Sequence, residues 1–227
     1  MLTGQSPYLD RSAGQKNRHQ RAAGLPRPTL PAGRKHAQMT VLLSYADYAE
    51  MRWKNGQGVT REVCRFPGSE AYDWRVSVAT IRENGAFSRF SGYLRNISVL
   101  EGDGMFLTLD GQRSALIPPF QATDFNGDSD AYCEVVGGPL LDFNVIYNPQ
   151  TTQAAVRWAC DGEWAHPQGT LLLFNAGDAL DVAVNAQSFT LQHYDSLLID
   201  APATLAVNAG ADTHFACVTL LSRSSRR

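Results

Sequence analysis

From Met39 onward the chain is a succession of short strand-like runs separated by turn signals, and this pattern limits the fold more than any other feature. The runs are rich in β-branched and aromatic residues, and several alternate in character with a period of two. Examples are VTREVCRF, DWRVSVATI, MFLTLDG, TLLLFNAG and HFACVTLLS. Strands that recur roughly every eight to twelve residues are typical of antiparallel sandwiches and barrels, so we predict an all-β fold.

The runs are too many for one small barrel. A division between Asp142 and Thr152 gives two comparable halves. The segments GMFLTLDGQRSALIPPF and SFTLQHYDSLLIDAPATLAVN also share an order of strand, polar turn and apolar strand. We therefore predict a weak internal duplication with two stacked β-barrels, residues 39–147 and 148–227. One larger sandwich is the alternative.

Residues 1–38 differ from the rest of the chain. They hold seven of its 20 Lys/Arg and one of its 22 Asp/Glu, which leaves 13 basic and 21 acidic residues for the remainder. Gly, Pro, Gln and Arg dominate this segment, so it cannot bury enough apolar surface to offset the entropy of ordering it. We predict a disordered basic arm, outside the fold, with Met39 as an alternative initiator.

Four widely separated cysteines, with no C-x-x-C pair and no apolar signal segment, favour reduced thiols in a cytoplasmic protein. No apolar run approaches the roughly 18–20 residues of a membrane helix, so no membrane partner is expected. The acidic body, with its aromatic residues on strand patterns, argues against nucleic acid.

The segment RWKNGQGVTRE concentrates charge and polar groups between Arg52 and Glu62. Nine Lys/Arg lie between Arg52 and Arg113, whereas Arg157 is the only one between Ser114 and Ser222. We expect some of these cations to face an anion. A P-loop is excluded because a strand, and no helix, follows the glycines. The bland alternative is a set of solvated charges beside a surface turn at Asn55-Gly56.

One face of DWRVSVATI carries small and polar side chains where a packed core needs bulk: Arg75, Ser77, Ala79 and Ile81. Such a row facing the inside of a barrel would leave a cavity with hydrogen-bonding walls. The alternative places this face in solvent and the Trp74 face inward. In VTREVCRF the same period groups Thr60 with Glu62 and Cys64, and Arg61 with Val63 and Arg65.

Motifs for metals and for nucleophilic catalysis are absent from the sequence. His166, His193 and His214 are each more than twenty residues apart, and no H-x-H or Cys pair occurs. DFNGDSD resembles the start of a calcium loop but lacks its glycine and its final glutamate, so we interpret it as an acidic turn. Neither G-x-S-x-G nor an activated cysteine is present. Glu62, Glu101, Asp128 and Asp142 could pair as acid and base.

Several of these motifs, in this order, resemble the HutD/Ves family. They are RWKNGQGVTRE, WRVSVATIRENGAFSRFSGYLRNISVLEGDGM, PPF, FNGD and GGPLLDFNV. The resemblance is strong from about Leu43 to Tyr147, continues more weakly to about Ser222, and departs at Gln57, where the family usually has glycine. It implies a bicupin, that is, two cupin-like antiparallel β-barrels in one chain.

Cupins usually bind a metal through G-x5-H-x-H-x3-E-x6-G. With Gly85 and Gly104 on the glycine positions, the ligand positions hold Ser91, Tyr93 and Ile97, and the last histidine of the second motif falls near Thr123. The imidazoles and the carboxylate are missing, so we expect no metal and no other cofactor.

The resemblance further implies a role in histidine utilisation. It suggests binding of an acidic intermediate such as formimidoylglutamate or formylglutamate, with a regulatory or flux-limiting effect. The predicted ligand-binding residues are Arg52, Lys54, Asn55, Thr60, Arg61, Glu62, Arg75 and Ser77. The cations would hold carboxylates, Asn55, Thr60 or Ser77 would contact the amide or formimidoyl end, and Glu62 would receive a cationic formimidoyl group or orient an arginine.

Two other function classes stay open at the level of sequence. One is a metal-independent cupin enzyme that acts on a small carboxylate through Glu62 and Arg75. The other is a protein-interaction role in which the cations face an acidic partner. A homodimer is an expectation from the cupin class alone.

Overall fold

Strands form nearly all the regular structure, as the alternating runs predicted. The computed structural model describes residues 39–223 except 54, 55, 57, 70, 159, 160, 211 and 212, and the predicted arm at residues 1–38 lies outside them. A 3-10 turn occupies Tyr45–Asp47. The strands are β1 (Thr40–Leu43), β2 (Ala49–Arg52), β3 (Gly58–Phe66), β4 (Trp74–Ile81), β5 (Gly85–Ala86), β6 (Leu94–Glu101), β7 (Met105–Leu109), β8 (Gln112–Arg113), β9 (Thr123–Asn126), β10 (Ala131–Val135), β11 (Leu140–Tyr147), β12 (Thr152–Trp158), β13 (Gly162–His166), β14 (Thr170–Asn175), β15 (Leu180–Val184), β16 (Gln187–Leu191), β17 (Ser196–Ile199), β18 (Ala203–Asn208) and β19 (Phe215–Ser222).

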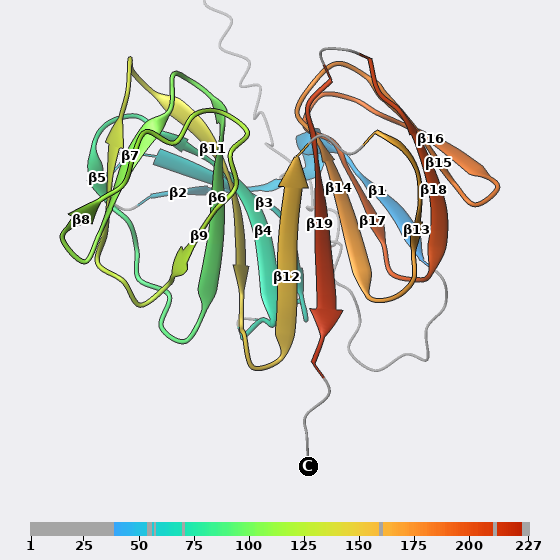
Figure 1. Ribbon diagram of the computed structural model, residues 1–227, viewed down its shortest axis with the longest axis horizontal. Coiled ribbons are helices and arrows are strands. Elements are labelled where there is room, and N and C mark those ends of the chain that lie inside the picture. The colour runs from blue at the N-terminus through green and yellow to red at the C-terminus, as the bar shows by residue number, and fades with distance from the viewer. Residues whose placement is uncertain are drawn as a thin grey trace, which may run out of the picture.

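These strands form four antiparallel sheets that follow one another from left to right in Figure 1. Inner sheet 1 has the order β2-β3-β4-β11-β6-β9, and inner sheet 2 has the order β1-β17-β14-β19-β12. Outer sheet 1, β5-β10-β7-β8, covers inner sheet 1, and outer sheet 2, β13-β18-β15-β16, covers inner sheet 2. We call each inner sheet with its outer sheet a half of the molecule.

The two inner sheets are buried on both faces, which explains their unbroken apolar runs. In TLLLFN, Leu172 and Phe174 point into a central core between the inner sheets, whereas Leu171 and Leu173 point into the core of the second half. A third core fills the first half around Ile97 and Leu107. A strand with a core on each face needs no polar alternation, and the side-chain period of two then sorts residues between two cores.

The strand order repeats between the halves with a constant offset of eight. β4-β11-β6-β9 of inner sheet 1 corresponds to β12-β19-β14-β17 of inner sheet 2, and β5-β10-β7-β8 corresponds to β13-β18-β15-β16. The repeated order supports an internal duplication. The two segments compared in the sequence are offset by one strand. The first segment covers β7 and β8, whose counterparts in the second half are β15 and β16, whereas the second segment covers β16 to β18.

The prediction of two closed barrels is not confirmed. Within the described residues each half is a pair of open sheets, and no hydrogen-bonded ladder joins an inner sheet to its outer sheet. The halves are also not strictly consecutive in the chain. β1 pairs with β17 from Thr40↔Ile199 to Leu43↔Ser196, so the first strand lies in the second half.

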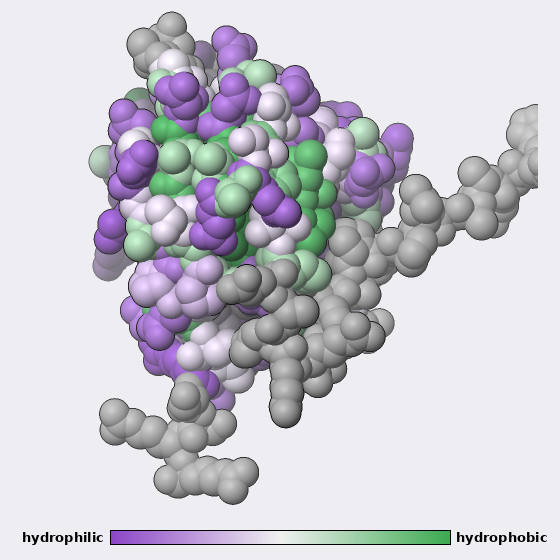
Figure 2. All heavy atoms as spheres, turned by 90° about the vertical axis from the view of Figure 1, so that its right-hand side faces the viewer, coloured by the Kyte–Doolittle hydropathy of each residue, from purple (hydrophilic) through white to green (hydrophobic). Residues whose placement is uncertain are grey.

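Outer sheet 2 presents its other face to solvent. Figure 2 shows this side of the molecule, where hydrophilic residues are spread between smaller hydrophobic patches. The burial of β15 alternates accordingly, with Leu180 and Val182 buried and Asp181 exposed. No helix among the described residues has the length and apolar character to cross a membrane.

Candidate functional site

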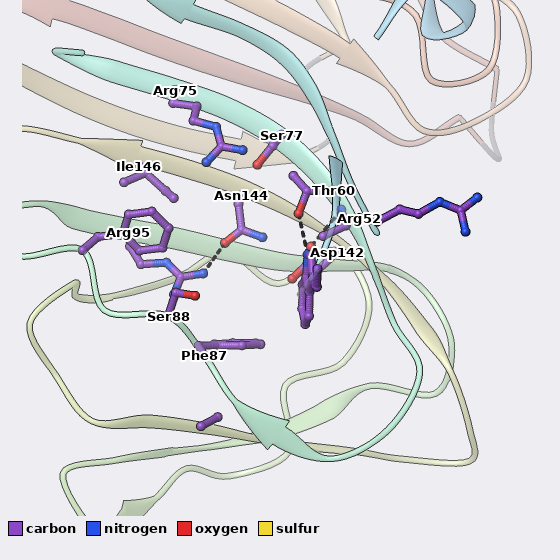
Figure 3. Close-up of a pocket in the computed structure, with 14 residues that line it drawn as sticks. Arg52, Thr60, Arg75, Ser77, Phe87, Ser88, Arg95, Asp142, Asn144 and Ile146 are labelled. Atoms are coloured by element: carbon purple, nitrogen blue, oxygen red, sulfur yellow. Dashed lines mark hydrogen bonds between the residues drawn. The ribbon is translucent and has the colours of Figure 1, made fainter. Parts of the chain in front are cut away.

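The first half contains a pocket of about 560 Å³ on the outer-sheet side of inner sheet 1. Its floor comes from β3, β4, β11 and β6, and its far wall comes from Ala86 of β5 and the segment 87–90 after it (Figure 3). The lining residues are Arg52, Trp53, Thr60, Arg75, Ser77, Ala79, Ala86, Phe87, Ser88, Phe90, Arg95, Asp142, Asn144 and Ile146.

Strand register arranges the floor in three rows. One row runs Arg65, Arg75, Ile146 and Arg95 across β3, β4, β11 and β6. The next row runs Glu62, Ser77, Asn144 and Ile97. The third runs Thr60, Ala79, Asp142 and Val99. Among the residues of these rows that line the pocket, the arginines form a cationic side, Ser77 and Asn144 a neutral polar middle, and Asp142 an acidic side.

A β-bulge in β3 builds the first part of the cationic row. The register shifts between Glu62 and Cys64, so Arg65 pairs with Arg75 and lies on the same face as Glu62. Glu62 accepts hydrogen bonds from Nε and Nη2 of Arg65 at 2.7 and 2.6 Å and from Nε of Arg75 at 2.9 Å. The predicted alternation, which separated Glu62 from Arg65, is wrong because the bulge adds one residue.

Arg95 is the most deeply buried cation of the site. It is 5% exposed, and its guanidinium lies 4.7 to 5.2 Å from the ring centres of Phe87, Phe90 and Phe125. Among the described residues its one hydrogen bond runs from Nη2 to Oδ1 of Asn144 at 2.7 Å, and its buried Nε has no partner. Burial lowers the pKa of Arg95 to about 10, so the guanidinium is still charged at neutral pH.

Asp142 is the carboxylate among the lining residues, and it is 2% exposed. Its Oδ1 accepts a hydrogen bond from the backbone N–H of Ala79 at 3.1 Å. Burial raises the pKa of Asp142 to about 7, against the lowering effect of Asn144 and Arg95. The carboxyl group can therefore take up or release a proton near neutral pH.

Trp53 closes the pocket beside Asp142. Its indole Nε1 donates to Oγ1 of Thr60 at 2.8 Å. Gly58 allows this approach, since a Cβ there would lie 2.8 Å from the indole ring and 2.6 Å from a backbone oxygen. The opposite wall is fixed by backbone bonds from Phe87 to Ala131 and from Phe90 to Gly127, both 2.8 Å.

The structure separates the residues proposed from the sequence. Thr60, Arg75 and Ser77 line the pocket, and Glu62 lies behind Arg75 as the group that orients it. Arg52 reaches only the rim: its side chain is 85% exposed, lies 3.7 Å from Glu50 and points away from the other lining residues in Figure 3.

Arg61 lies on the opposite face of β3 and does not line the pocket. It donates to Glu50 at 3.0 Å and lies 4.8 Å from the ring centre of Tyr45. Odd and even residues before the bulge point to opposite faces, which puts Arg61 and Thr60 on different sides of the sheet. Lys54 and Asn55 lie outside the described residues.

The face of β4 opposite the pocket also has a clear role. Trp74, Val76 and Val78 belong to the central core between the halves, while Arg75, Ser77 and Ala79 line the pocket. The two readings of this strand in the sequence are thus both partly correct. The Trp74 face is buried, and the polar face borders a cavity.

Sequence reasoning missed Arg95 and Asn144 and named Asp142 only as one of several acids. Asp142 and Asn144 are polar residues two apart in the apolar run LLDFNVIY, and Arg95 is in phase with the buried residues Ile97 and Val99. A polar residue at a position where the strand period predicts a buried side chain could have identified these three residues as members of the site.

The residues at the cupin ligand positions do not line the pocket. Ile97 is part of the first-half core, and Tyr93 donates its hydroxyl to the Tyr72 carbonyl at 2.8 Å. Within the described part of the chain, no group of three His, Cys, Asp or Glu side chains is placed to hold a metal ion. In the acidic turn of DFNGDSD, Asp124 accepts from Asn96, and Asp128 accepts from the Gly92 N–H.

The second half has a cleft of about 520 Å³ between β12, β13 and β19. It is lined by one arginine, Arg157, whereas the first-half pocket is lined by three. Cys217, Thr219 and Leu221 of β19 occupy its floor, where β11 places Asp142, Asn144 and Ile146 in the first half. The cationic row is therefore a property of the first half.

Known proteins resemble this chain over most of its length. An uncharacterised 21.2 kDa protein in the hutC 3′ region of Pseudomonas putida is 40% identical over 187 residues, 80% of this chain and 97% of the relative. A conserved protein of unknown function from Pseudomonas aeruginosa has 37% identity and a TM-score of 0.76, covering 80% of this chain and 98% of that structure. HutD from Pseudomonas fluorescens has 34% identity and a TM-score of 0.71, covering 82% and 100%.

More distant structures share the fold alone. A cupin 2 conserved barrel domain protein from Leptotrichia buccalis has 11% identity and a TM-score of 0.52 over 80% of this chain and 100% of that structure. The fold is thus all-β and cupin-like. The HutD family model matches residues 45–217, and together with the relatives above this shows that the chain belongs to the HutD family.

Proposed function

We propose that this protein binds a small carboxylate-bearing ligand without a metal, in the first-half pocket. The ligand is a glutamate derivative of histidine degradation, such as formimidoylglutamate or formylglutamate, and binding serves a regulatory or flux-limiting role. Membership of the HutD family supports the association with histidine utilisation, as does the relative encoded in the hutC 3′ region. In this proposal, each half of the molecule corresponds to one cupin-like barrel.

Arg95 is the observation that carries the proposal. Burial of a cation is costly unless an anion and hydrogen bonds compensate it. Arg95 forms no ion pair within 4 Å among the described residues, and its aromatic neighbours with one amide bond satisfy few of its five N–H donors. A carboxylate in the pocket would supply the missing partner, and Arg75 in the same row would supply a second cation for a dicarboxylate.

Isothermal titration with formimidoylglutamate, formylglutamate and glutamate tests this function. We expect saturable binding to the wild type, and loss of most of the affinity in Arg95→Met. Arg113→Met is the matched control, because Arg113 also lies over an aromatic ring, Phe106 at 3.5 Å, but is outside the pocket. Absence of binding by all three acids, or equal losses in both variants, would contradict the proposal.

Asp142 favours a second candidate, a metal-independent enzyme that acts on a small carboxylate. A carboxyl group with a pKa of about 7 in a pocket can act as general acid or base. Incubation of each ligand with the protein, followed by NMR of the ligand, distinguishes the two. A binding protein returns the ligand intact, whereas an enzyme gives product that Asp142→Asn no longer forms.

A further inference from the structure

The cations and the carboxylate of the pocket lie in different rows of the sheet, and this separation indicates which ends a ligand must have. Arg75 and Arg95 flank Ile146 in one row, and Asp142 lies four residues further along β11. At about 3.4 Å per residue, the two rows are about 14 Å apart at the backbone. In Figure 3 the two arginines lie on one side of the pocket, Asp142 lies beside Thr60 on the other, and Ser77 and Asn144 lie between.

The side chains shorten this gap to the size of a small amino-acid derivative. Arg95 extends toward the middle row, where its Nη2 reaches Asn144 at 2.7 Å. Asn144 is one row from Asp142 on the same face of β11. A ligand held at its acidic end by the arginines would therefore bring its other end to the Asp142 side.

Glu62 does not serve as the acidic end of the pocket. Both of its oxygens accept hydrogen bonds from arginines of this chain, at 2.6 to 2.9 Å. Asp142, by contrast, has no ion pair within 4 Å among the described residues, and its Oδ1 accepts from the Ala79 N–H. It is the carboxylate free to accept from a ligand.

We propose that Asp142 selects ligands whose non-acidic end carries N–H donors. It favours ligands that end in an amidinium over ligands that end in a neutral amide or an aldehyde-like carbonyl. The inference rests on the proposed binding function and assigns the ligand class within it. Ionised Asp142 offers only acceptors and pairs with an amidinium through two parallel N–H···O bonds, whereas a carbonyl oxygen can accept only from the protonated form.

The surroundings of Asp142 fit this role. Its pKa near 7 leaves it partly protonated when the pocket holds no cation, and a cationic ligand end would favour the ionised form. The titratable and charged groups around it are Arg95 of β6 and Cys133 of β10, with Arg75 and Arg52 in the same pocket and the Glu62–Arg65 pair on β3. Burial raises the pKa of Cys133 to about 12, so its thiol adds no charge.

Formimidoylglutamate and formylglutamate are a matched pair for the test, since they differ only in an N–H-bearing nitrogen in place of the formyl oxygen. Titration of the full chain should show the formimidoyl compound binding about tenfold or more tightly, which corresponds to about 1.4 kcal/mol. Asp142→Asn should reduce this ratio to near one. Asp178→Asn, an exposed aspartate in the second half, should leave the ratio unchanged.

A second measurement does not depend on the folding of a variant. Titration of the wild type at pH 7 in two buffers of different ionisation enthalpy counts the protons exchanged on binding. The formimidoyl compound should release protons from Asp142, and the formyl compound should not. Equal affinities for the two acids, or a preference for the formyl compound, would overturn the inference while leaving the binding function intact. Silence with both acids would remove the binding function itself.

Discussion

The Nε of Arg75 donates to Oε2 of Glu62 at 2.9 Å, so the side chain of Arg75 is held from behind while its terminal nitrogens face the pocket. Glu62 is 9% exposed and Arg75 is 14% exposed at the side chain, which shields the pair from solvent. The relationship depends on the bulge of β3, because the same carboxylate also binds Arg65. Glu62 thus acts on a ligand through the position of an arginine.

Replacement of Glu62 by alanine separates positioning from simple charge. If charge alone mattered, removal of an anion beside the pocket would strengthen the binding of an acidic ligand. We expect the opposite, a loss of about fivefold to tenfold, because Arg75 would lose its fixed orientation. Calorimetry of Glu62→Ala against Glu50→Ala checks this, since Glu50 carries the same charge but pairs with Arg61 on the other face. Tighter binding by Glu62→Ala would refute the positioning role.

Replacement of Arg95 by methionine should remove ligand binding without destabilising the fold. Apolar replacement of buried ion pairs is often neutral or stabilising by about 1–4 kcal/mol, and Arg95 lacks even the carboxylate partner that would offset its burial. Urea unfolding gives the free energy of unfolding of the variant. A loss of more than about 2 kcal/mol would show instead that Arg95 is a structural cation whose bond to Asn144 holds the sheet together.

Asp142 predicts an unusual dependence of stability on pH. Its pKa in the folded state, about 7, lies above its unfolded value near 3.9, so the folded state binds more protons between these values. The free energy of unfolding should therefore fall as pH rises from about 4 to 7, by up to about 4 kcal/mol from this group.

Asp142→Asn should abolish that part of the pH dependence. Relative to the wild type, the variant should gain stability between pH 5 and pH 8, measured by urea unfolding at both values. Asp178→Asn provides the comparison, because its side chain is exposed. A constant difference between Asp142→Asn and the wild type across this range would show that Asp142 is ionised throughout.

Phe143 tests whether the two halves unfold together. It is fully buried in the central core, where its ring lies 4.6 Å from that of Phe174 in the second half. Phe143→Ala should cost about 3–5 kcal/mol, as is usual for large core aromatics. Because the core is shared, we expect one cooperative transition at a lower denaturant midpoint. Two separated transitions would mean that the halves fold independently; Tyr132→Ala, 44% exposed, is the control.

Much of the fold followed from the sequence because the period of two is a local signal. Strand runs such as WRVSVATI and LRNISVLE were recognisable, and turn dipeptides marked most of their ends. Sheet order is not local. Nothing in the residues of TVLL states that Thr40 pairs with Ile199 across most of the chain, so the crossing of β1 was not predictable.

The site followed from the sequence only in part, for two physical reasons. A bulge shifts the period by one residue, and the pattern VTREVCRF shows no mark of the shift that brings Arg65 to Glu62. The second reason is that the pocket residues come from six strands, β2 to β6 and β11, and from the loops that hold Trp53 and Phe87. Arg75 and Ser77 stood out within one strand, but Arg95 and Asp142 gain their meaning from partners on β11 and β4, which only the register reveals.

The position of β1 links the two halves of the molecule, because a strand that precedes the first half pairs with a strand of the second half. The described part of the chain begins with β1 in the second half, passes through the whole first half, and returns through Thr152 to the sheet that contains β1. A cut between β11 and β12 would therefore not yield two self-sufficient pieces, since the C-terminal piece would expose the β17 edge that Thr40–Leu43 covers. Two fragments co-expressed from separate genes should reassemble only when the first fragment begins before Thr40. The pairing of Thr40–Leu43 with β17 would then hold the two fragments together without a covalent bond.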